Sequence, residues 1–318
     1  MEVRTETGRF ATGSGAAWGW SEDIGTYALA AAVNSLAAKE AVCLGVEAQI
    51  LFPPRAGNSK AYALERSFRK SCLERGIDQV TSQVRFNPLT SLPVVAVLAG
   101  GAASEADSPD SSADAVQMRC GRRRQAEAGR ASEEGKGLQN IRPGGEIVLV
   151  KWIGMEGMLR IAEEKGEELG KRFAPVFIRQ IQSRRKEIFA GKELEIARSA
   201  GALYVRQITE GGILAALWEL AKNTGFGLDV DMKRMSVLQE TIEVCEQYRL
   251  NPYQLTSVGS FLMVSEDGKA LAEALRRNRI HASVIGHLTE GNDKIIHNGG
   301  ETRYLDRPAP DDLYKILL

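Results

Sequence analysis

Residues 207–221 read Gln-Ile-Thr-Glu-Gly-Gly-Ile-Leu-Ala-Ala-Leu-Trp-Glu-Leu-Ala, and this stretch is the most informative about the fold. A strand predicted over 202–207 breaks at the paired glycines Gly211 and Gly212, and an apolar helix is predicted over 213–223. Glycines let the backbone approach a ligand, and the free amides at a helix start suit an anion such as phosphate. A tight strand-to-helix turn that binds no ligand explains the pattern equally well.

The rest of the second half mixes helices and strands. The predicted strands are 147–152, 228–232, 260–264 and 283–289, the predicted helices are 155–172, 174–190, 192–200, 236–248 and 266–278, and a closing hairpin is predicted over 294–298 and 301–305. These elements follow no strict strand–helix–strand repeat, which favours an α+β layered sandwich over a doubly wound sheet.

The first hundred residues predict an α/β block. Apolar residues at helical spacing predict a mostly buried helix over 22–47 and a second helix over 60–75, with a glycine stop at residue 76. Strands are predicted over 46–52, 80–86 and 93–98. The chain is therefore divided into an α/β domain over 1–142 and an α+β domain over 143–318.

The stretch 101–142 breaks the composition of the chain. An acidic run of small residues is followed by a basic run around Cys120, and almost nothing in it offsets the entropy of ordering by burial. We predict an extended, mobile insertion. If the segment were ordered, the arginines beside Cys120 would lower the pKa of its thiol.

The composition excludes several classes of protein. Lys plus Arg and Asp plus Glu number 41 each, so no net positive field attracts nucleic acid or anionic lipid. No apolar run approaches the roughly 20 residues of a membrane span, and the start lacks a signal-peptide pattern. We therefore expect a cytoplasmic protein without nucleic-acid or membrane partners. The spacing of the 4 Cys and 3 His residues predicts neither a disulfide framework nor a zinc site.

Several motifs resemble the aminoimidazole-ribonucleotide-synthetase-like (PurM-like) superfamily. They are the stretch 209–221, the Gly-Phe-Gly-Leu-Asp-Val-Asp of 225–231, the Val-Leu-Gln-Glu-Thr of 237–241, the Ser-Val-Gly-Ser-Phe-Leu of 257–262, and 144–157 with its Gly-Met-Glu-Gly turn. The segments 303–305 and 312–315 are similar to the branch of the hydrogenase maturation factor HypE. The resemblance covers most of 144–318 and, more weakly, 22–100.

The resemblance implies a two-domain architecture in which N-terminal strands pair across a homodimer and build a β-barrel. It also implies ATP in a cleft between the domains, Mg2+ on N-terminal acidic residues, and either a small-molecule substrate or a maturation partner protein. The residues it places at the nucleotide are Asn34, Thr209, Glu210, Gly211, Gly212 and Gly259. No catalytic residue and no metal ligand is assigned.

The chain also departs from the family pattern. Residues 13–17 offer glycine without an acid, Asn34-Ser35 stands where the family carries Asn-Asp, and 81–85 replaces a Gly-Asp-Thr type segment. Since Mg2+ prefers carboxylate oxygens and phosphoryl transfer depends on metal and cationic clamps, we expect a degenerate metal–nucleotide site with weak or absent phosphoryl transfer. The family's carbamoyl dehydratases use a cysteine at the extreme C-terminus, whereas this sequence finishes Tyr-Lys-Ile-Leu-Leu, so we do not expect that chemistry.

Two alternatives stay open. The first is an active ATP-dependent synthetase or kinase whose metal is held by Glu6, Glu22, Asp23 or Glu210. The second is a non-enzymatic dimeric scaffold, in which the barrel and the charged insertion contact a partner.

Overall fold

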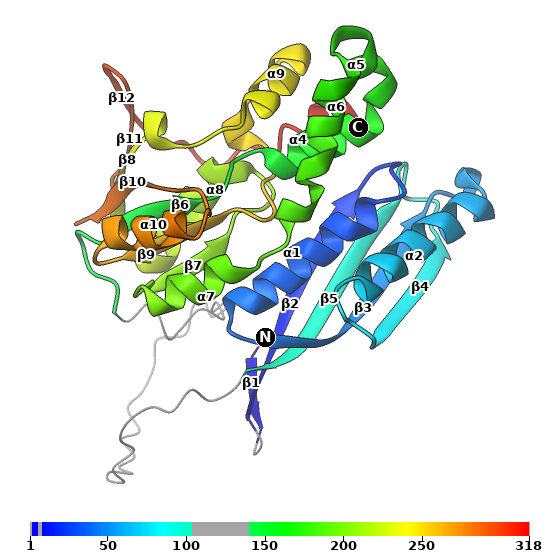
Figure 1. Cartoon of the computed structure of the whole chain (residues 1–318), viewed down its shortest axis with the longest axis horizontal. Coiled ribbons are helices and arrows are strands. Elements are labelled where there is room, and N and C mark those ends of the chain that lie inside the picture. The colour runs from blue at the N-terminus through cyan, green and yellow to red at the C-terminus, as the bar shows by residue number, and fades with distance from the viewer. Residues whose placement is uncertain (1, 6–7, 104–139, 318) are drawn as a thin grey trace.

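The computed structural model describes residues 2–5, 8–103 and 140–317, which form two β-sheets with helices packed on them (Figure 1). Most of the predicted insertion, including Cys120, lies outside the described residues, as does Glu6. No helix of the described residues combines the length and the apolar character that crossing a bilayer requires.

The first sheet has the strand order β1-β2-β5-β3-β4. Only β3 and β4 pair in parallel; the other neighbours are antiparallel. Two helices cover one face, and the other face carries no helix of the first half (Figure 1). The elements are β1 (Glu2–Thr5), β2 (Gly8–Trp18), α1 (Ile24–Ala38), β3 (Val42–Phe52), a 3-10 turn (Pro54–Ala56), α2 (Asn58–Leu73), β4 (Val80–Phe86) and β5 (Val94–Ala103). Within the described residues this sheet ends at β1 and β4 and does not close into a barrel.

Strand β2 was not predicted, because its glycines and alanines have low strand propensity. It forms because it pairs with β5 over its whole length and passes close beneath helix α1. A Cβ atom on Gly13 would lie 2.1 Å from the carbonyl oxygen of Ala32, and one on Gly15 would lie 2.3 Å from that of Ala28. Glycine at both positions is therefore what allows the helix to approach the strand.

The predicted helix over 22–47 is too long. Helix α1 ends at Ala38, and Glu40 adopts a positive φ of 63° before strand β3 begins at Val42. The apolar residues from Val42 onward continue the composition of the helix, so the apolar pattern did not reveal the boundary. In the second half, the long helices predicted over 155–172 and 174–190 are each interrupted, near residues 165 and 184.

The second sheet has the order β12-β11-β8-β10-β6-β9-β7 and carries helices on both faces, so the mixed arrangement predicted for this half is confirmed. Alternate residues of β6 face opposite cores: Ile147 and Leu149 pack with helix α8, and Val148 and Val150 with α7 and α10. The strands are β6 (Glu146–Val150), β7 (Tyr204–Gln207), β8 (Gly227–Asp231), β9 (Phe261–Ser265), β10 (Ala282–Thr289), β11 (Lys294–Asn298) and β12 (Glu301–Tyr304). The helices are α4 (Met155–Glu164), α5 (Gly166–Arg172), α6 (Pro175–Ser183), α7 (Lys192–Ser199), α8 (Gly212–Thr224), α9 (Gln239–Tyr248), α10 (Gly268–Arg277) and α11 (Tyr314–Leu317), with 3-10 turns at Arg184–Ile188, Met232–Arg234 and Pro252–Gln254.

Polar contacts join the two halves along α1 and α4. The Tyr27 hydroxyl donates to Glu163 Oε1 at 2.6 Å, and the Ser21 hydroxyl donates to Glu163 Oε2 at 2.8 Å. Burial raises the pKa of the Glu163 carboxyl. Arg185 pairs with Asp23 at 2.5 Å. Because these contacts fix α4 against the first half, they also fix the walls of the cavity described next.

Candidate functional site

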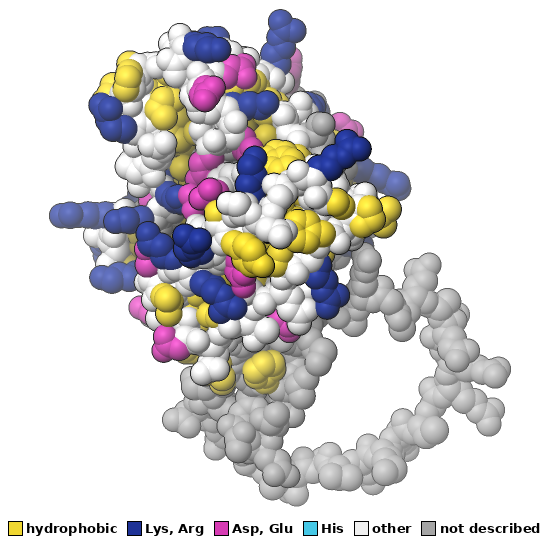
Figure 2. All heavy atoms as spheres, turned by 90° about the vertical axis from the view of Figure 1, so that its right-hand side faces the viewer, with side chains coloured by type: hydrophobic (Ala, Val, Ile, Leu, Met, Phe, Trp, Pro, Cys, Tyr) yellow, Lys and Arg dark blue, Asp and Glu magenta, His cyan; other side chains and the backbone are white. Residues whose placement is uncertain are grey.

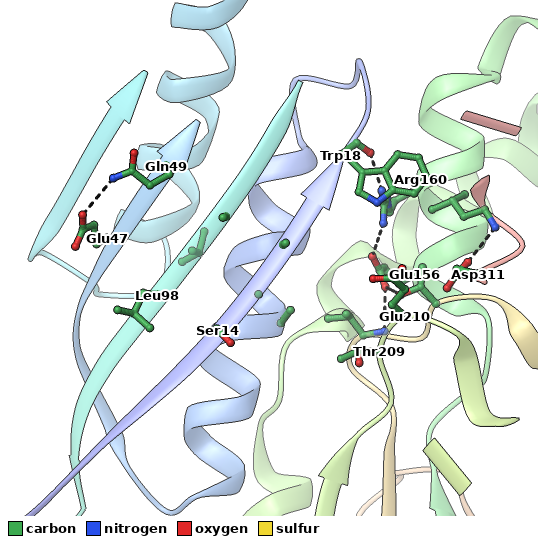
Figure 3. Close-up of a pocket in the computed structure, with 18 residues that line it drawn as sticks. Ser14, Trp18, Glu47, Gln49, Leu98, Glu156, Arg160, Thr209, Glu210 and Asp311 are labelled. Carbon is green, nitrogen blue, oxygen red and sulfur yellow. Dashed lines mark hydrogen bonds and ion pairs between the residues drawn. The ribbon is translucent and has the colours of Figure 1, made fainter. Parts of the chain in front are cut away.

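A cavity of about 610 Å³ lies between the helix-free face of the first sheet and the second half of the chain (Figure 3). Strands β2, β3 and β5 form one wall. Helix α4, the turn after β7, the segment before β9 and the segment before α11 form the other. Its lining residues are Ser14, Gly15, Ala16, Trp18, Ala31, Glu47, Gln49, Ala96, Val97, Leu98, Glu156, Arg160, Thr209, Glu210, Thr256, Val258, Asp311 and Leu313.

A buried ion pair on α4 lies at this second wall. Arg160 Nη1 lies 3.2 Å from Glu156 Oε1, and both side chains are almost fully buried. Thr256 Oγ1 donates to Glu156 Oε2 at 2.5 Å, and the backbone N–H of Val258 donates to the same oxygen at 3.1 Å. The carboxylate therefore holds the segment before β9 against α4, and it compensates the buried guanidinium.

Arg160 also reaches the first half of the chain. Its Nη2 donates to the carbonyl oxygen of Trp18 at 2.6 Å, and its guanidinium carbon lies 4.9 Å from the centre of the Trp18 ring. Its third polar atom, Nε, is buried and has no hydrogen-bond partner among the described residues. A buried N–H without a partner is uncommon in folded proteins, so this one calls for an explanation.

The segment before α11 closes one side of the cavity. Asp311 Oδ2 accepts a hydrogen bond of 2.8 Å from the backbone N–H of Gly211, and Asp311 Oδ1 accepts one of 2.9 Å from Leu313 N. The Tyr314 ring stacks on Trp18 with centroids 4.7 Å apart, and its hydroxyl donates to Glu210. Burial raises the pKa of Asp311 to about 6, despite these two hydrogen bonds.

Carboxylates dominate the charge of the cavity. Among the described residues that line it, Glu47, Glu156, Glu210 and Asp311 carry carboxyl groups, whereas Arg160 is the single cation. Figure 3 shows Glu47 beside Gln49 on the sheet, far from the group around Arg160. An anionic ligand therefore meets a field that opposes it unless cations accompany it or a carboxyl is displaced.

Two of the six predicted nucleotide residues, Thr209 and Glu210, line the cavity. Gly211 and Gly212 form the predicted turn into α8, with positive φ values of 79° and 66°, so the strand–turn–helix prediction is confirmed. Gly212 fits closely, because a Cβ atom there would lie 2.5 Å from the carbonyl oxygen of Tyr253.

The other two, Asn34 and Gly259, lie at the junction of the halves and do not line the cavity. Asn34 is fully buried, and its amide nitrogen donates to Ile188 O at 2.8 Å and to Gln207 Oε1 at 2.6 Å. A Cβ atom on Gly259 would lie 2.6 Å from the backbone of Ile188. The structure thus gives both residues packing contacts that the sequence pattern did not reveal.

The described residues contain no group of three or more His, Cys, Asp or Glu side chains placed to hold a metal ion. Of the acids considered as alternative metal ligands, Glu22 is exposed, Asp23 pairs with Arg185, and Glu210 accepts from a tyrosine hydroxyl. The segment 81–85 lies in the edge strand β4 and does not line the cavity. The donor set therefore offers Mg2+ single carboxylates rather than a preformed cage.

Four charged residues of the cavity, Glu47, Glu156, Arg160 and Asp311, were not among the predicted site residues. Glu156 stood within the Gly-Met-Glu-Gly turn, and together with Arg160 it forms an i,i+4 pair on an otherwise apolar helix face, a pattern visible in the sequence. Asp311 had no such signal, because it is 100 residues from its partner Gly211.

Comparison with known proteins shows which families and solved structures this chain is similar to. Residues 142–298 match the family model of the AIR synthase related protein, C-terminal domain. A putative hydrogenase expression/formation protein of Methanocaldococcus jannaschii is 23% identical over 191 residues, which cover 58% of this chain and 55% of that protein. The carbamoyl dehydratase HypE of Rhodobacter capsulatus is 29% identical over 104 residues, 33% of this chain and 30% of that protein. The matches thus span about half, and under a third, of these relatives' lengths.

Solved structures share the fold over nearly the whole chain. The crystal structure of E. coli HypE, a hydrogenase maturation protein, matches with a TM-score of 0.68 and 16% identity, covering 98% of this chain and 89% of that one. HypE in complex with ATP matches with a TM-score of 0.65 and 16% identity over 98% and 88% of the two chains. A HypE–HypF complex matches with a TM-score of 0.63 and 16% identity over 94% and 90%. This chain therefore has the PurM-like fold of the HypE structures, and residues 142–298 match the AIR-synthase-related C-terminal domain family.

Proposed function

We propose that this protein binds ATP in the cavity between its two halves, and that phosphoryl transfer there is weak or absent. The cavity itself carries the proposal. It lies between the sheet of the first half and the Thr209–Gly212 turn, in a fold whose HypE representative has been crystallised with ATP. Its volume of about 610 Å³ is within the usual range for small-molecule sites, roughly 300–1,000 Å³.

The lining residues offer ATP a limited set of contacts. Ser14 and Thr209 present hydroxyl groups, and Arg160 presents the single guanidinium among the described lining residues. A bound Mg2+ would neutralise phosphate charge, but the described residues supply it no cluster of carboxylates. Both features support binding that is weaker than in a complete site and transfer that is weaker still.

Homodimerisation is the second part of the proposal. The helix-free face of the first sheet exposes large apolar side chains, with Phe10 38%, Val42 73% and Leu98 48% exposed. Strands β1 and β4 leave the two edges of this sheet unpaired. A second copy of the chain that paired with these edges would satisfy their backbone groups and also cover the apolar face. The result would be the barrel that the family resemblance implies. A light-scattering mass of one chain at micromolar concentration would refute this part.

A maturation partner protein is also supported by a specific surface. Figure 2 shows the side of the molecule formed by α2 and β4, where hydrophobic side chains gather between Lys and Arg side chains. The exposed apolar residues of these elements and the following loop are Tyr62 (60%), Leu73 (64%), Phe86 (43%) and Leu89 (91%). Such a patch is typical of a protein-binding surface, and one HypE representative has been crystallised with HypF.

Calorimetric titration with Mg-ATP tests the binding proposal. We expect binding in the high micromolar to millimolar range, and no heat and no thermal shift at millimolar ATP would refute it. The same samples, assayed for ADP release with and without candidate small substrates, test the transfer proposal. Substrate-dependent release that is lost in Glu210→Ala would instead establish an active synthetase or kinase.

A further inference from the structure

Helix α2 carries a straight stripe of exposed side chains on the side of the molecule shown in Figure 2. The stripe consists of Tyr62, Arg66, Arg69 and Leu73. Their spacing of i, i+4, i+7 and i+11 places all four on one face of an α-helix, over a length of about 16 Å. The residues that α2 buries in the core lie on the opposite face. The stripe is therefore one continuous surface open to solvent.

The two ends of the stripe are apolar. Tyr62 is 60% exposed and Leu73 is 64% exposed, and with Phe86 and Leu89 they make up the exposed apolar patch described above. A shallow hollow of about 360 Å³ next to this patch is lined by Tyr62, Glu65, Arg66 and Arg69. An apolar patch of this kind, bordered by polar side chains, is typical of a surface that binds a protein.

The middle of the stripe is positively charged. The cations of α2 are Lys60, Arg66, Arg69 and Lys70, and its acid is Glu65, whereas the whole chain has no net charge. Glu65 is already engaged, because its Oε1 accepts from Ser82 Oγ at 2.5 Å and lies 3.3 Å from Arg69 Nε. Arg66 has no hydrogen bond and no ion pair among the described residues. An acidic partner would therefore meet a guanidinium that has no counter-charge within the described chain.

We propose that this stripe docks an acidic amphipathic helix of a partner protein. Two apolar residues of that helix, three turns apart, contact Tyr62 and Leu73, and carboxylates between them pair with Arg66. A helix fits better than an extended segment, because two helices side by side present side chains with the same repeat of 3.6 residues. The inference deepens the proposed function, on which it rests for the existence of a partner protein.

Nucleic acid fits this surface less well than a protein helix. A nucleic acid would use the cations through its phosphates, but phosphates offer no contact to the exposed apolar side chains of Tyr62 and Leu73. The apolar ends of the stripe therefore favour a protein.

This surface stays free in the other parts of the proposed function. The proposed dimer uses the helix-free face of the first sheet, whereas α2 lies on the other face (Figure 1). None of the four stripe residues lines the cavity. Docking, dimerisation and ATP binding can therefore be tested separately.

Fluorescence anisotropy with labelled peptides tests the proposal on the full chain. The probe is a synthetic peptide of about 20 residues, long enough to form a helix alone, with leucines at i and i+11 and glutamates at i+4 and i+7. This spacing is the same in both directions, so the peptide can bind in either orientation. A second peptide has lysines in place of the glutamates. We expect the acidic peptide to bind about tenfold more tightly than the lysine peptide, and its affinity to decrease as salt is added.

Substitutions in the stripe test the named contacts. Tyr62→Ala and Arg66→Glu should each weaken binding of the acidic peptide about tenfold, whereas Arg66→Lys, which keeps the charge, should weaken it less than about threefold. The matched control is Arg277→Glu on α10, because it changes the net charge by the same amount at another exposed arginine. We expect this control to bind the acidic peptide as the wild type does.

Equal binding of the two peptides, or equal effects of Arg66→Glu and Arg277→Glu, would overturn the proposal. Binding of a single-stranded oligonucleotide that Arg66→Glu abolishes, without binding of the acidic peptide, would show that the stripe binds nucleic acid instead. Calorimetry with Mg-ATP on the same samples separates the two proposals. ATP binding without peptide binding would refute docking and leave the nucleotide proposal intact, and peptide binding without ATP binding would do the reverse.

Discussion

Asn34 is predicted to contact the nucleotide, but in the structure its side chain connects the two halves by hydrogen bonds, and a substitution can distinguish these two roles. The residue is fully buried, and Asn34→Ala removes both of its donor contacts, to Ile188 O and Gln207 Oε1, together with its acceptor contact from Ala190 N at 2.6 Å. Each hydrogen bond contributes about 1 kcal/mol net, and a buried partner left without a bond costs about 1–3 kcal/mol.

Three lost bonds therefore predict a decrease of about 3–5 kcal/mol in the free energy of unfolding. This is a large part of the roughly 5–15 kcal/mol that stabilises a typical domain. Urea denaturation followed by circular dichroism, without ligand, measures the decrease. The ligand-free state matters because a bound nucleotide would add its own stabilisation. The control is Asn292→Ala, an exposed asparagine for which we expect a change within about 0.5 kcal/mol.

The two roles of Asn34 give opposite results. A joint residue predicts a large loss of stability, with a nucleotide affinity that is unchanged at temperatures where the variant is folded. The opposite result would be a loss of stability below about 1 kcal/mol, comparable with a single hydrogen bond, together with a tenfold loss of ATP affinity. That result would show that Asn34 contacts the nucleotide and that our interpretation of the junction is wrong.

Three further predictions concern packing, buried charge and pH. Gly13→Ala should destabilise the protein by about 1–3 kcal/mol, because its Cβ atom would lie 2.1 Å from a carbonyl oxygen of α1. Ser14→Ala, on the opposite face of the strand, should leave the free energy of unfolding almost unchanged in the same urea experiment. Glu156→Gln should lower the free energy of unfolding by about 3–5 kcal/mol, because it leaves the buried guanidinium of Arg160 without its counter-charge. Glu273→Gln, at an exposed ion pair, should lower it by less than about 1 kcal/mol. Equal decreases in the two variants would contradict the argument. Burial raises the pKa of Asp311 to about 6, so the folded state binds this proton more tightly than the unfolded state does. The free energy of unfolding of the wild type, relative to that of Asp311→Asn, should therefore decrease as pH rises from about 4 to about 6 and then stay constant. A difference that does not change with pH would refute the raised pKa.

The sequence was sufficient where local chemistry determines the backbone. The paired glycines at 211 and 212 both have positive φ, and the predicted strand 80–86 matches β4 residue for residue. It was insufficient where distant contacts determine it. Strand β2 owes its existence to pairing with β5, and its glycines, which lower strand propensity, are what allow α1 to pack on it.

The candidate site shows the same limit. Thr209 and Glu210 line the cavity and lie in a turn that the local sequence predicts, and their contact with a nucleotide stays a prediction. For Asn34 the nucleotide contact also stays a prediction, and a short motif could not show that this residue contacts Ile188 and Gln207, more than 150 positions away. Asp311 was missed because its only distinguishing feature is the contact with Gly211, which exists only after folding.

The charges of the cavity connect these observations. With Arg160 the single cation among the described lining residues, and partly neutralised by Glu156, a polyphosphate finds little positive charge at rest. Asp311 adds to this imbalance, because its carboxyl group lines the cavity and already accepts the Gly211 N–H. We therefore expect the affinity for an anion beside Arg160 to depend more on Glu156, Glu210 and Asp311 than on Glu47, which lies on the far wall (Figure 3).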